Sequence, residues 1–362
     1  MNEKFELFGL VSIQKITQKH LYTLLERFGS PQNIMSASVK DLRPIVGSEV
    51  TQNIASFSID NVLRRKWKLL QQLSIQLIPY YAADYPAWLK QIDSFPPVIF
   101  VRGKILLEDE ISIAVIGTRG ASVYGKEIAR RFAGEFAQAG VTVVSGLARG
   151  VDTEAHRGAL QNSGRTIAVL GCGIDTCYPP ENKELMHKII KQGAVVSEFN
   201  INTPPFAGNF PKRNRIVSGL AKAVVAIEAK EKSGVMNTVR WALEQNKDVF
   251  AIPGNILSKT SFGTNKLIKD GAIPVTSADD VLEYLGLRHT LQERETEEFL
   301  IDESERAVWE AISFEPICLD ALSEKINQST SAILNVLLRL EIKGYVKQLP
   351  GMTFVRSFET PD

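Results

Sequence analysis

The chain has 362 residues, which is long enough for two or three domains with a sizeable core. Its residues are 44% hydrophobic and 23% charged, and the formal net charge is +1. This balance excludes a globally basic nucleic-acid coat protein, so any nucleic-acid site must be a local basic patch.

Cysteine usage and the lack of long apolar segments predict a cytoplasmic protein. The three cysteines, Cys172, Cys177 and Cys318, form no Cys-x-x-Cys pair, which argues against a disulfide framework and against a zinc site. We therefore expect a reducing compartment, no metal and no other cofactor. The first residues lack the apolar run of a signal peptide. No segment approaches the roughly 20 apolar residues that cross a bilayer, so we expect no membrane contact.

Residues 1–75 are expected to form a small helical domain of the sterile-alpha-motif (SAM) or helix-hairpin-helix type. Apolar residues recur at helical spacing from Leu21 to Phe28, and a second helical pattern ends at Gly47. A helix-hairpin-helix motif donates backbone N–H groups of a glycine-rich hairpin to a DNA phosphate. That motif usually has two glycines where this chain has one, so a purely structural hairpin is favoured.

Residues 76–110 are expected to be a linking segment that packs on the edge of the next domain. Prolines at four positions, from Pro79 to Pro97, prevent long regular elements there. Within this segment we expect one short strand, at 98–101.

Residues 111–286 alternate between apolar runs and helical patterns, which predicts an α/β core with a parallel sheet. We expect a Rossmann-like, doubly wound, mostly parallel sheet in which ligands sit at the carboxyl ends of the strands. The expected strands cover residues 113–116, 141–144, 167–170, 195–197, 224–227, 249–252 and 274–276, and the clearest helices cover 126–138, 153–161 and 236–245.

The C-terminal part is expected to be an acidic linker at 287–304 and a winged helix at 305–362. Three helical patterns precede two strand patterns around the turn Pro350-Gly351. The presumed recognition helix, 329–341, carries Arg339 but little other positive charge. A DNA reader normally has a basic face, so a protein contact or a regulatory role is favoured at least as much.

The segment from Phe210 to Arg215 is the strongest candidate for ligand binding. Three cations, Lys212, Arg213 and Arg215, lie with Asn214 and Phe210 at the expected start of a helix. Helix N-termini attract phosphates, and an aromatic ring offers a face on which a base stacks. The combination suits a single-stranded nucleic acid. The alternative is a solvated basic turn with Phe210 in the core.

Three loops follow expected strands and should meet at one edge of the sheet, where glycine-bearing turns expose N–H groups to anions. Their candidate residues are Gly117, Thr118 and Arg119 in the first loop, Ser145, Gly146, Arg149 and Gly150 in the second, and Ser233, Gly234 and Thr238 in the third. Asp152 is expected to cap the following helix, and His156 to be packed or capping. The loops lack the spacing of the G-x-G-x-x-G dinucleotide fingerprint.

These loops carry phosphate affinity without paired carboxylates, a metal cluster or an activated nucleophile. A binding protein is therefore favoured over an enzyme.

The motifs of the core resemble those of the bacterial DNA-processing protein A family, also called Smf. The order and spacing of the shared motifs span nearly all of 111–286, so chance agreement is negligible. They are Gly117-Thr118-Arg119, Ser145-Gly146-x-Ala148-x-Gly150-Val151-Asp152-x-x-Ala155-His156, Gly171-x-Gly173-x-Asp175-x-x-Tyr178-Pro179, Ser197-Glu198, Phe210-Pro211-x-Arg213-Asn214-Arg215-Ile216, Ser233-Gly234-x-x-x-Thr238 and Ile252-Pro253-Gly254-Asn255.

The resemblance implies a homodimer that binds single-stranded DNA without strong sequence preference. It also implies a role in loading the recombinase RecA onto DNA covered by single-strand-binding protein, most often during natural transformation. Carried over by position, Arg119 and the 212–215 segment would hold phosphates and Phe210 would stack a base or brace its loop. The family dimer forms through the late part of the core, which makes Leu267 and Ile268 candidates for the dimer contact.

Two other classes of function compete with this hypothesis. A phosphoribohydrolase of nucleotide metabolism has a related core, but its P-G-G-x-G-T-x-x-E loop requires a glutamate where this chain has Trp241. A winged-helix transcription regulator would need a basic recognition helix, which residues 329–341 do not provide.

Overall fold

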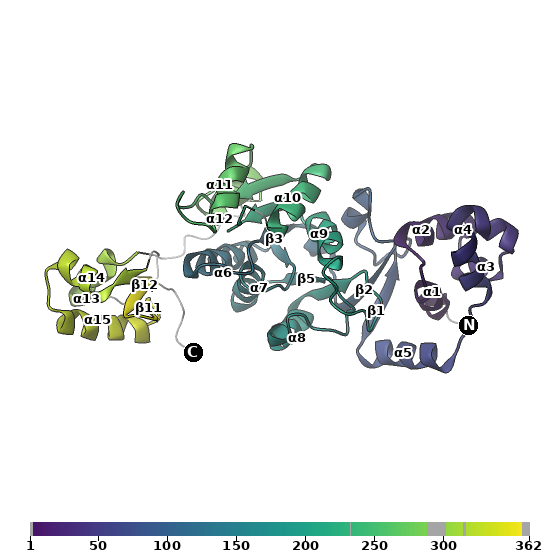
Figure 1. Ribbon diagram of the computed structural model, residues 1–362, viewed down its shortest axis with the longest axis horizontal. Helices are drawn as coiled ribbons and strands as arrows, with labels where there is room; N and C mark the ends of the chain where they lie inside the picture. Colours follow the sequence, from purple (N-terminus) through teal and green to yellow (C-terminus); the bar gives the residue numbers. More distant parts are fainter. Residues whose placement is uncertain (1–2, 232, 288–301, 314–315, 357–362) are drawn as a thin grey trace.

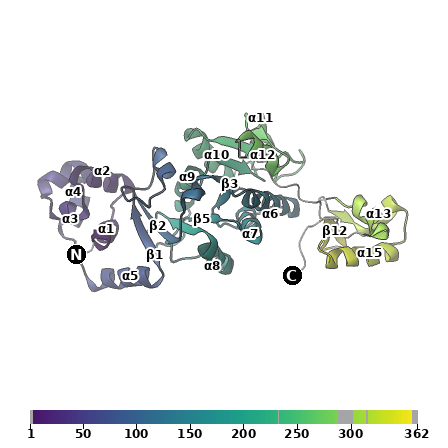
Figure 2. The same cartoon turned by 180° about the vertical axis from the view of Figure 1, so that it is seen from behind.

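The computed structural model describes residues 3–231, 233–287, 302–313 and 316–356. Its elements fall into three groups along the long axis of the molecule (Figures 1 and 2). Helices of the N-terminal part lie at one end, a large sheet with its helices lies in the middle, and the C-terminal helices and hairpin lie at the other end.

Five helices form the N-terminal part, and four of them begin at a residue that caps them. The helices are α1 (Glu3–Val11), α2 (Gln18–Phe28), α3 (Pro31–Ser36), α4 (Val39–Ala55) and α5 (Asn61–Gln72). The side chains of Thr17, Ser30, Ser38 and Asp60 each accept a backbone N–H of the helix that follows, which satisfies a group without an intrahelical partner. Gly47 interrupts α4 with φ +75°, a conformation that favours glycine, so the expected hairpin lies inside this element.

The sheet of the middle part has nine strands in the order β1-β2-β6-β5-β4-β3-β7-β8-β9. The strands are β1 (Ile75–Pro79), β2 (Val98–Gly103), β3 (Ser112–Ile116), β4 (Thr142–Ser145), β5 (Thr166–Leu170), β6 (Ala194–Ser197), β7 (Ala223–Ala226), β8 (Asp248–Ala251) and β9 (Ile273–Pro274). Strands β3 to β9 pair in parallel, and β1 and β2 join the edge antiparallel. The predicted mostly parallel, doubly wound α/β fold is confirmed.

Helices cover both faces of this sheet because its inner strands are apolar on both sides. They are α6 (Val123–Gln138), α7 (Val151–Gln161), α8 (Lys183–Gln192), α9 (Asn209–Leu220), α10 (Gly234–Glu244), α11 (Phe262–Lys269) and α12 (Ala278–Tyr284), with short 3-10 turns at Ala87–Gln91, Leu107–Glu110 and Pro180–Asn182. In β3, Ile113 and Val115 pack in the cluster that contains α6 and α7, while Ala114 and Ile116 pack in the cluster that contains α9 and α10. This alternation follows the two-residue period of a strand.

Residues 76–110 differ from the expected linking segment because two strands, not one, lie between residues 75 and 103. The expected strand at 98–101 is present as β2, which pairs with β6. Strand β1 was not expected, and it pairs with β2 in register from Ile75 opposite Arg102 to Pro79 opposite Val98. An edge strand tolerates proline because one side of it needs no ladder hydrogen bonds.

The C-terminal part is a winged helix, as the sequence predicts. Its elements are α13 (Glu303–Ala311), β10 (Ile317–Cys318), α14 (Leu319–Ile326), α15 (Thr330–Ile342), β11 (Val346–Leu349) and β12 (Thr353–Arg356). Ser329 caps α15 by accepting the N–H of Ala332. Most of the acidic linker expected at 287–304 lies outside the described residues. No helix within the described ranges is both long and apolar enough to span a bilayer.

Candidate nucleic-acid interface

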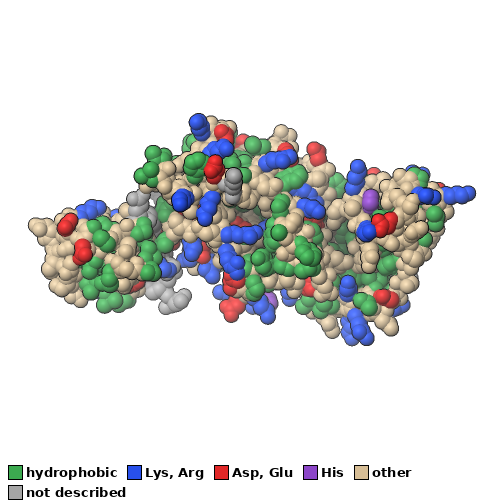
Figure 3. All heavy atoms as spheres, viewed as in Figure 1, with side chains coloured by type: hydrophobic (Ala, Val, Ile, Leu, Met, Phe, Trp, Pro, Cys, Tyr) green, Lys and Arg blue, Asp and Glu red, His purple; other side chains and the backbone are tan. Residues whose placement is uncertain are grey.

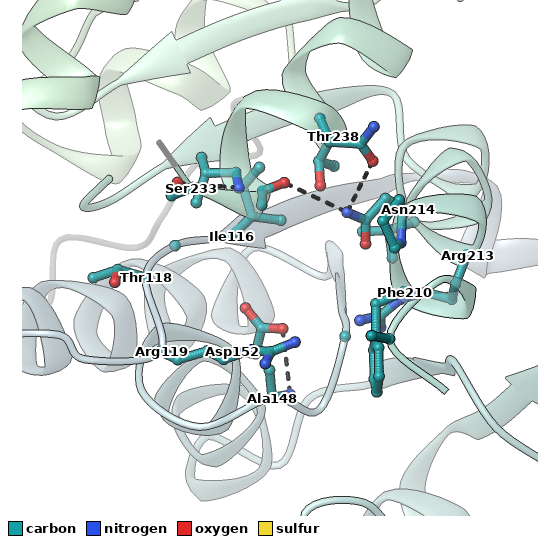
Figure 4. Close-up of a pocket in the computed structure, with 18 of the residues that line it drawn as sticks. Ile116, Thr118, Arg119, Ala148, Asp152, Phe210, Arg213, Asn214, Ser233 and Thr238 are labelled. Atoms are coloured by element: carbon teal, nitrogen blue, oxygen red, sulfur yellow. Dashed lines mark hydrogen bonds between the residues drawn. The ribbon is translucent and has the colours of Figure 1, made fainter. Parts of the chain in front are cut away.

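A pocket of about 550 Å³ lies at the carboxyl edge of the sheet, where the strand order reverses between β3 and β7. Ligands of open α/β sheets bind in this crevice. The loops after β3, β4 and β7 line it together with the N-terminal half of α9 (Figure 4). The structure thus brings together the three loops and the 210–215 segment that the sequence singles out.

Ten of the candidate residues line this pocket and five do not. The lining residues are Gly117, Thr118, Arg119, Gly146, Phe210, Arg213, Asn214, Ser233, Gly234 and Thr238. The candidates outside the lining are Ser145, Arg149, Gly150, Lys212 and Arg215.

Phe210 presents a half-buried ring to the pocket. The ring packs against Tyr178 with centroids 5.6 Å apart and the planes tilted by 46°. The guanidinium carbon of Arg119 lies 5.2 Å from the centroid of Phe210, within the range of a cation–π contact. A base entering the pocket therefore meets an aromatic surface with a cation beside it (Figure 4).

Exposed cations lie in and around the pocket. Arg119 and Lys230 line it with exposed side chains. Lys212 is exposed on the first turn of α9, next to the lining residues Pro211 and Arg213. Within the described part of the chain, these three side chains form no ion pair. Their charge remains available for phosphates.

Arg213 lines the pocket from inside and is only 4% exposed. Its guanidinium donates a hydrogen bond to the carbonyl of Val169. A Cβ at position 146 would collide with the guanidinium of Arg213, so a larger residue there would displace this side chain. Burial lowers the pKa of Arg213 from its ordinary value, while the charge of Asp152 opposes that shift. Arg213 thus supports the loop after β4. The sequence predicts that it contacts a phosphate directly, but only a small part of its side chain is exposed for such a contact.

The role expected for Arg215 is corrected. The side chain is 8% exposed and forms a bidentate ion pair with Glu198, with Nη1–Oε1 at 2.8 Å and Nη2–Oε2 at 2.6 Å. Its Nε donates to the carbonyl of Ser94 at 2.8 Å. All these bonds tie α9 to β6 and to the 76–110 segment, so Arg215 is structural and not a phosphate ligand.

Asn214 joins α9 to the start of α10. Its Nδ2 donates to the carbonyl of Gly234 at 3.4 Å and to Oδ1 of Asn237 at 3.2 Å. Ser233 caps α10 by accepting the N–H of Val235. The two helix starts are thereby held on opposite sides of one pocket.

The loop after β4 differs from expectation at several residues. The hydroxyl of Ser145 is buried and donates to the carbonyl of Val115 at 2.6 Å, and Arg149 forms an exposed ion pair with Glu181. Gly150, and not Asp152, is the N-cap of α7. Buried Asp152 lies inside the helix and accepts the N–H of Ala148 at 3.3 Å, and burial raises its pKa. The hydroxyl of Ser145 is thus already occupied, and Arg149 reaches a ligand only by leaving its exposed partner Glu181.

His156 is a packed residue. It is fully buried, and its Nδ1 lies 2.7 Å from the hydroxyl of Thr166. Burial lowers its pKa to about 3, so the imidazole is neutral at physiological pH.

One of the two dimer candidates is placed differently from expectation. Leu267 is 5% exposed and packs in the core of this chain, so its side chain does not reach a second copy. Ile268 is partly buried against the same core. The exposed apolar side chains nearby are Ile256, Leu257 and Phe262.

Four residues of the site were not assigned a role from the sequence. Tyr178 supports the ring of Phe210, and Lys230 and Asn237 line the pocket. Buried Glu228 organises the loops: its carboxylate accepts the N–H and hydroxyl of Ser122 at 2.9 and 2.7 Å. Glu228 and Lys230 lie two and four residues after the end of β7. This position at the carboxyl end of a strand is the signal that would have predicted them.

Among the described residues, the lining of the pocket offers cations, hydroxyl groups and amides. Its lining contains one carboxylate, Asp152, which already accepts a backbone hydrogen bond and lies beside the charge of Arg213. The described residues hold no group of three or more histidines, cysteines or carboxylates that could bind a metal ion.

Comparison with known proteins agrees with these motifs. A family model described as DNA recombination-mediator protein A matches residues 76–286, and one described as the DprA winged helix domain matches residues 292–352. Protein Smf of Escherichia coli is 39% identical over 290 residues, covering 78% of this chain and 78% of the relative. The DNA processing protein DprA of Bacillus subtilis is 34% identical over 283 residues, covering 77% of this chain and 95% of the relative.

Two solved structures share the fold at substantial sequence identity. The X-ray structure of DNA processing protein A from Streptococcus pneumoniae has a TM-score of 0.69 at 33% identity, covering 77% of this chain and 97% of that one. The DNA processing protein A of Helicobacter pylori, a structure described as showing a single-stranded DNA binding mode, has a TM-score of 0.53 at 30% identity, covering 59% of this chain and 96% of that one. By its core, its winged helix and these relatives, the chain belongs to the DNA recombination-mediator protein A family, whose members include DprA and Smf.

Proposed function

We propose that the pocket at the carboxyl edge of the sheet binds one unpaired strand of DNA with little sequence preference. Phe210 stacks a base, and Arg119, Lys212 and Lys230 hold backbone phosphates. Stacking and phosphate contacts read no base edges, so sequence preference is low. The observation that carries this proposal is the Phe210 ring with the Arg119 guanidinium 5.2 Å away in an open pocket. The strand-binding relative from Helicobacter pylori supports it.

We infer further that the protein acts in the cytoplasm as a mediator, helping RecA load onto single-stranded DNA covered by single-strand-binding protein. Membership in a recombination-mediator family supports this role. A mediator must hold DNA without altering it, and the single, hydrogen-bonded carboxylate of the pocket accords with that requirement.

A homodimer is the third part of the proposal. Ile256 and Leu257, 83% and 87% exposed, follow β8, and half-exposed Phe262 begins α11. A second copy would remove this apolar surface from water, which favours association. Light scattering of the variant Ile256→Asp/Leu257→Asp should give a monomer where the native protein gives a dimer. If the native protein is a monomer at micromolar concentration, the homodimer proposal is wrong and the DNA-binding proposal is unaffected.

The experiment for DNA binding compares oligo-dT with a duplex of equal length by fluorescence anisotropy. We expect tighter binding of the single strand. Because a charge-assisted hydrogen bond contributes about 1.5 kcal/mol or more, the variant Arg119→Ala/Lys212→Ala should lose at least about tenfold in affinity while remaining folded. The control variant Arg27→Ala/Lys40→Ala removes the same charge from exposed positions of α2 and α4. Equal binding of all three proteins would place the site elsewhere.

The competing phosphoribohydrolase is tested by incubation with AMP. That activity needs a glutamate where this chain has Trp241, and the side chain of Trp241 instead donates to the carbonyl of Pro211 at 3.2 Å. Release of adenine that is lost in the Arg119→Ala variant would favour the enzyme over the binding protein.

A further inference from the structure

A second recess, of about 580 Å³, lies at the opposite edge of the sheet. It is formed where α5 turns into β1, where β2 ends and where β6 begins. Its lining contains four cations and no carboxylate: Arg102, Lys104, Arg165 and Lys191 are joined by polar Gln72, Ser74 and Gln76 and by apolar Leu73, Leu106 and Ile190. An excess of unpaired positive charge in a concave surface attracts anions.

Three of these cations are available for a ligand. Lys104 and Lys191 are exposed, and their ammonium groups form no ion pair or hydrogen bond with the described residues. Arg102 donates only its Nε, to the carbonyl of Leu73 at 3.1 Å, which leaves its terminal nitrogens without a partner in the described ranges.

Arg165 has a different task in the same recess. Its Nε donates to Oδ1 of buried Asp109 at 2.7 Å, and its Nη2 donates to the carbonyl of Lys104 at 2.8 Å. Oε1 of Glu108 also lies 3.4 Å from this Nε. Because Asp109 and Glu108 together neutralise it, Arg165 fixes the backbone that carries Lys104 and adds no net positive charge. Hydrogen bonds of Arg165 thus hold the backbone of the recess in place, and Lys104 and Lys191 remain exposed.

Helix α5 continues this basic surface away from the sheet. It carries Arg64, Arg65, Lys66 and Lys68 and no acidic residue. Arg64, Lys68 and the recess residue Gln72 follow one another at four-residue spacing, which places them in one row on the helix. At 1.5 Å per residue, Lys68 and Arg64 lie about 6 and 12 Å from Gln72 along the axis. The ribbon shows α5 running directly into β1, and Lys and Arg side chains project from this helix at the lower edge of Figure 3.

Folding stability does not account for these charges. Like charges at Arg64 and Lys68 repel because they are four residues apart on one face. Cations in the N-terminal half of a helix are not favoured by its dipole, and the exposed arginines of α5 form no ion pair among the described residues. A function that needs positive charge explains their presence better.

We propose that Arg102, Lys104 and Lys191, with Arg64 and Lys68 of α5, form a second phosphate-binding surface for an unpaired polynucleotide strand. We expect this surface to prefer a single strand over a duplex because its cations lie at a recess. The flexible backbone of a single strand can enter the recess, and a stiff duplex cannot. Gln72, Ser74 and Gln76 offer hydrogen bonds to phosphate or sugar, and Leu73 and Leu106 offer apolar contacts to bases.

The position of this surface predicts how a bound strand is arranged. The first pocket lies at the carboxyl ends of the parallel strands, beside β3 and β7, and the second recess lies at their amino ends, beside β2 and β6. They are separated by the length of a strand such as β5, about 15 Å, and by the three strand spacings from β6 to β3, about 14 Å across the sheet. A short oligonucleotide occupies only the pocket. A longer strand passes around the edge of the sheet and reaches both surfaces.

The test measures binding of the full-length variant Lys104→Gln/Lys191→Gln to oligo-dT of about 6 and about 30 nucleotides and to a duplex, at several salt concentrations. Two lost phosphate contacts make the log–log salt slope for the long strand shallower by about 1.4. We expect at least a fivefold loss of affinity for the long strand and no change for the short one. The variant Arg64→Gln/Lys68→Gln should give the same pattern, and the control Arg27→Gln/Lys40→Gln, with the same loss of charge, should not.

Three results would overturn the inference. Long-strand affinity equal to that of the control would show that the recess binds no nucleic acid. A loss confined to the duplex would assign the surface to double-stranded DNA, and an equal loss for the short strand would show a general effect of charge. Failure of the pocket proposal is distinguishable, because it would appear as absent binding of the short oligonucleotide by the native protein.

Discussion

Replacement of Phe210 tests whether the pocket stacks a base. The variant Phe210→Ala removes the ring that lies 5.6 Å from Tyr178 and 5.2 Å from the guanidinium of Arg119. Stacking of a base on an aromatic side chain contributes about 1–3 kcal/mol. Affinity for oligo-dT should therefore fall by about 5- to 150-fold. Because the ring is only half-buried, part of its surface remains available to a ligand before DNA binds.

The assay is a fluorescence anisotropy titration of the native protein and four variants at one salt concentration, with thermal unfolding measured for each. Phe210→Tyr keeps an aromatic face and should bind within about threefold of the native protein, because the difference in stacking is well below 1 kcal/mol. Phe210→Leu keeps an apolar side chain without an aromatic face and should behave as Phe210→Ala does. Tyr22→Ala removes a half-exposed ring of α2 and serves as the control. If Phe210→Leu and Phe210→Ala bind as the native protein does, Phe210 only braces its loop.

Two further predictions concern the buried groups around the site. Arg215→Met should lower the free energy of unfolding by about 3–5 kcal/mol, because it leaves Glu198 as an uncompensated buried charge. Urea unfolding measures this, and a variant of native stability with weakened DNA binding would restore the phosphate role to Arg215. Burial lowers the pKa of His156 to about 3, whereas its pKa in the unfolded chain is about 6.5. Below about pH 6.5 only the unfolded chain binds the proton, so the free energy of unfolding falls as the pH falls. Between pH 7 and 5 the native protein should lose about 2 kcal/mol more than His156→Gln, and equal losses would show that His156 is accessible to protons when folded.

The fold could be predicted from the sequence where local pattern and environment agree. The inner parallel strands are mostly apolar runs because helices cover both of their faces. All seven strands expected in the core lie within about two residues of those observed. Strand β1 was missed because its sequence, Ile75 to Pro79, is short, ends in proline and gains its place only by pairing with β2. Such pairing is a long-range property that local pattern does not contain.

The candidate site could be predicted in its location but not in every side chain. Loops after parallel strands must meet at the carboxyl edge, so the pocket follows from the order of strands and glycines. The apolar positions Ile216, Val217 and Leu220 place Arg213 on the buried face of α9, three, four and seven residues before them, so its burial was also readable. The burial of Arg215 could not be predicted from the sequence. Its partner Glu198 follows β6 and meets α9 only in the folded chain.

The salt dependence of binding to a short oligo-dT, of about 6 nucleotides, tests the central claim most directly. Contacts of Arg119, Lys212 and Lys230 with three phosphates predict a log–log slope near −2 for the native protein, at about −0.7 per phosphate. The variant in which all three residues are alanine should show a slope near zero. A flat response of the native protein, or an unchanged slope in the variant, would contradict the claim that these cations hold an unpaired strand in the pocket.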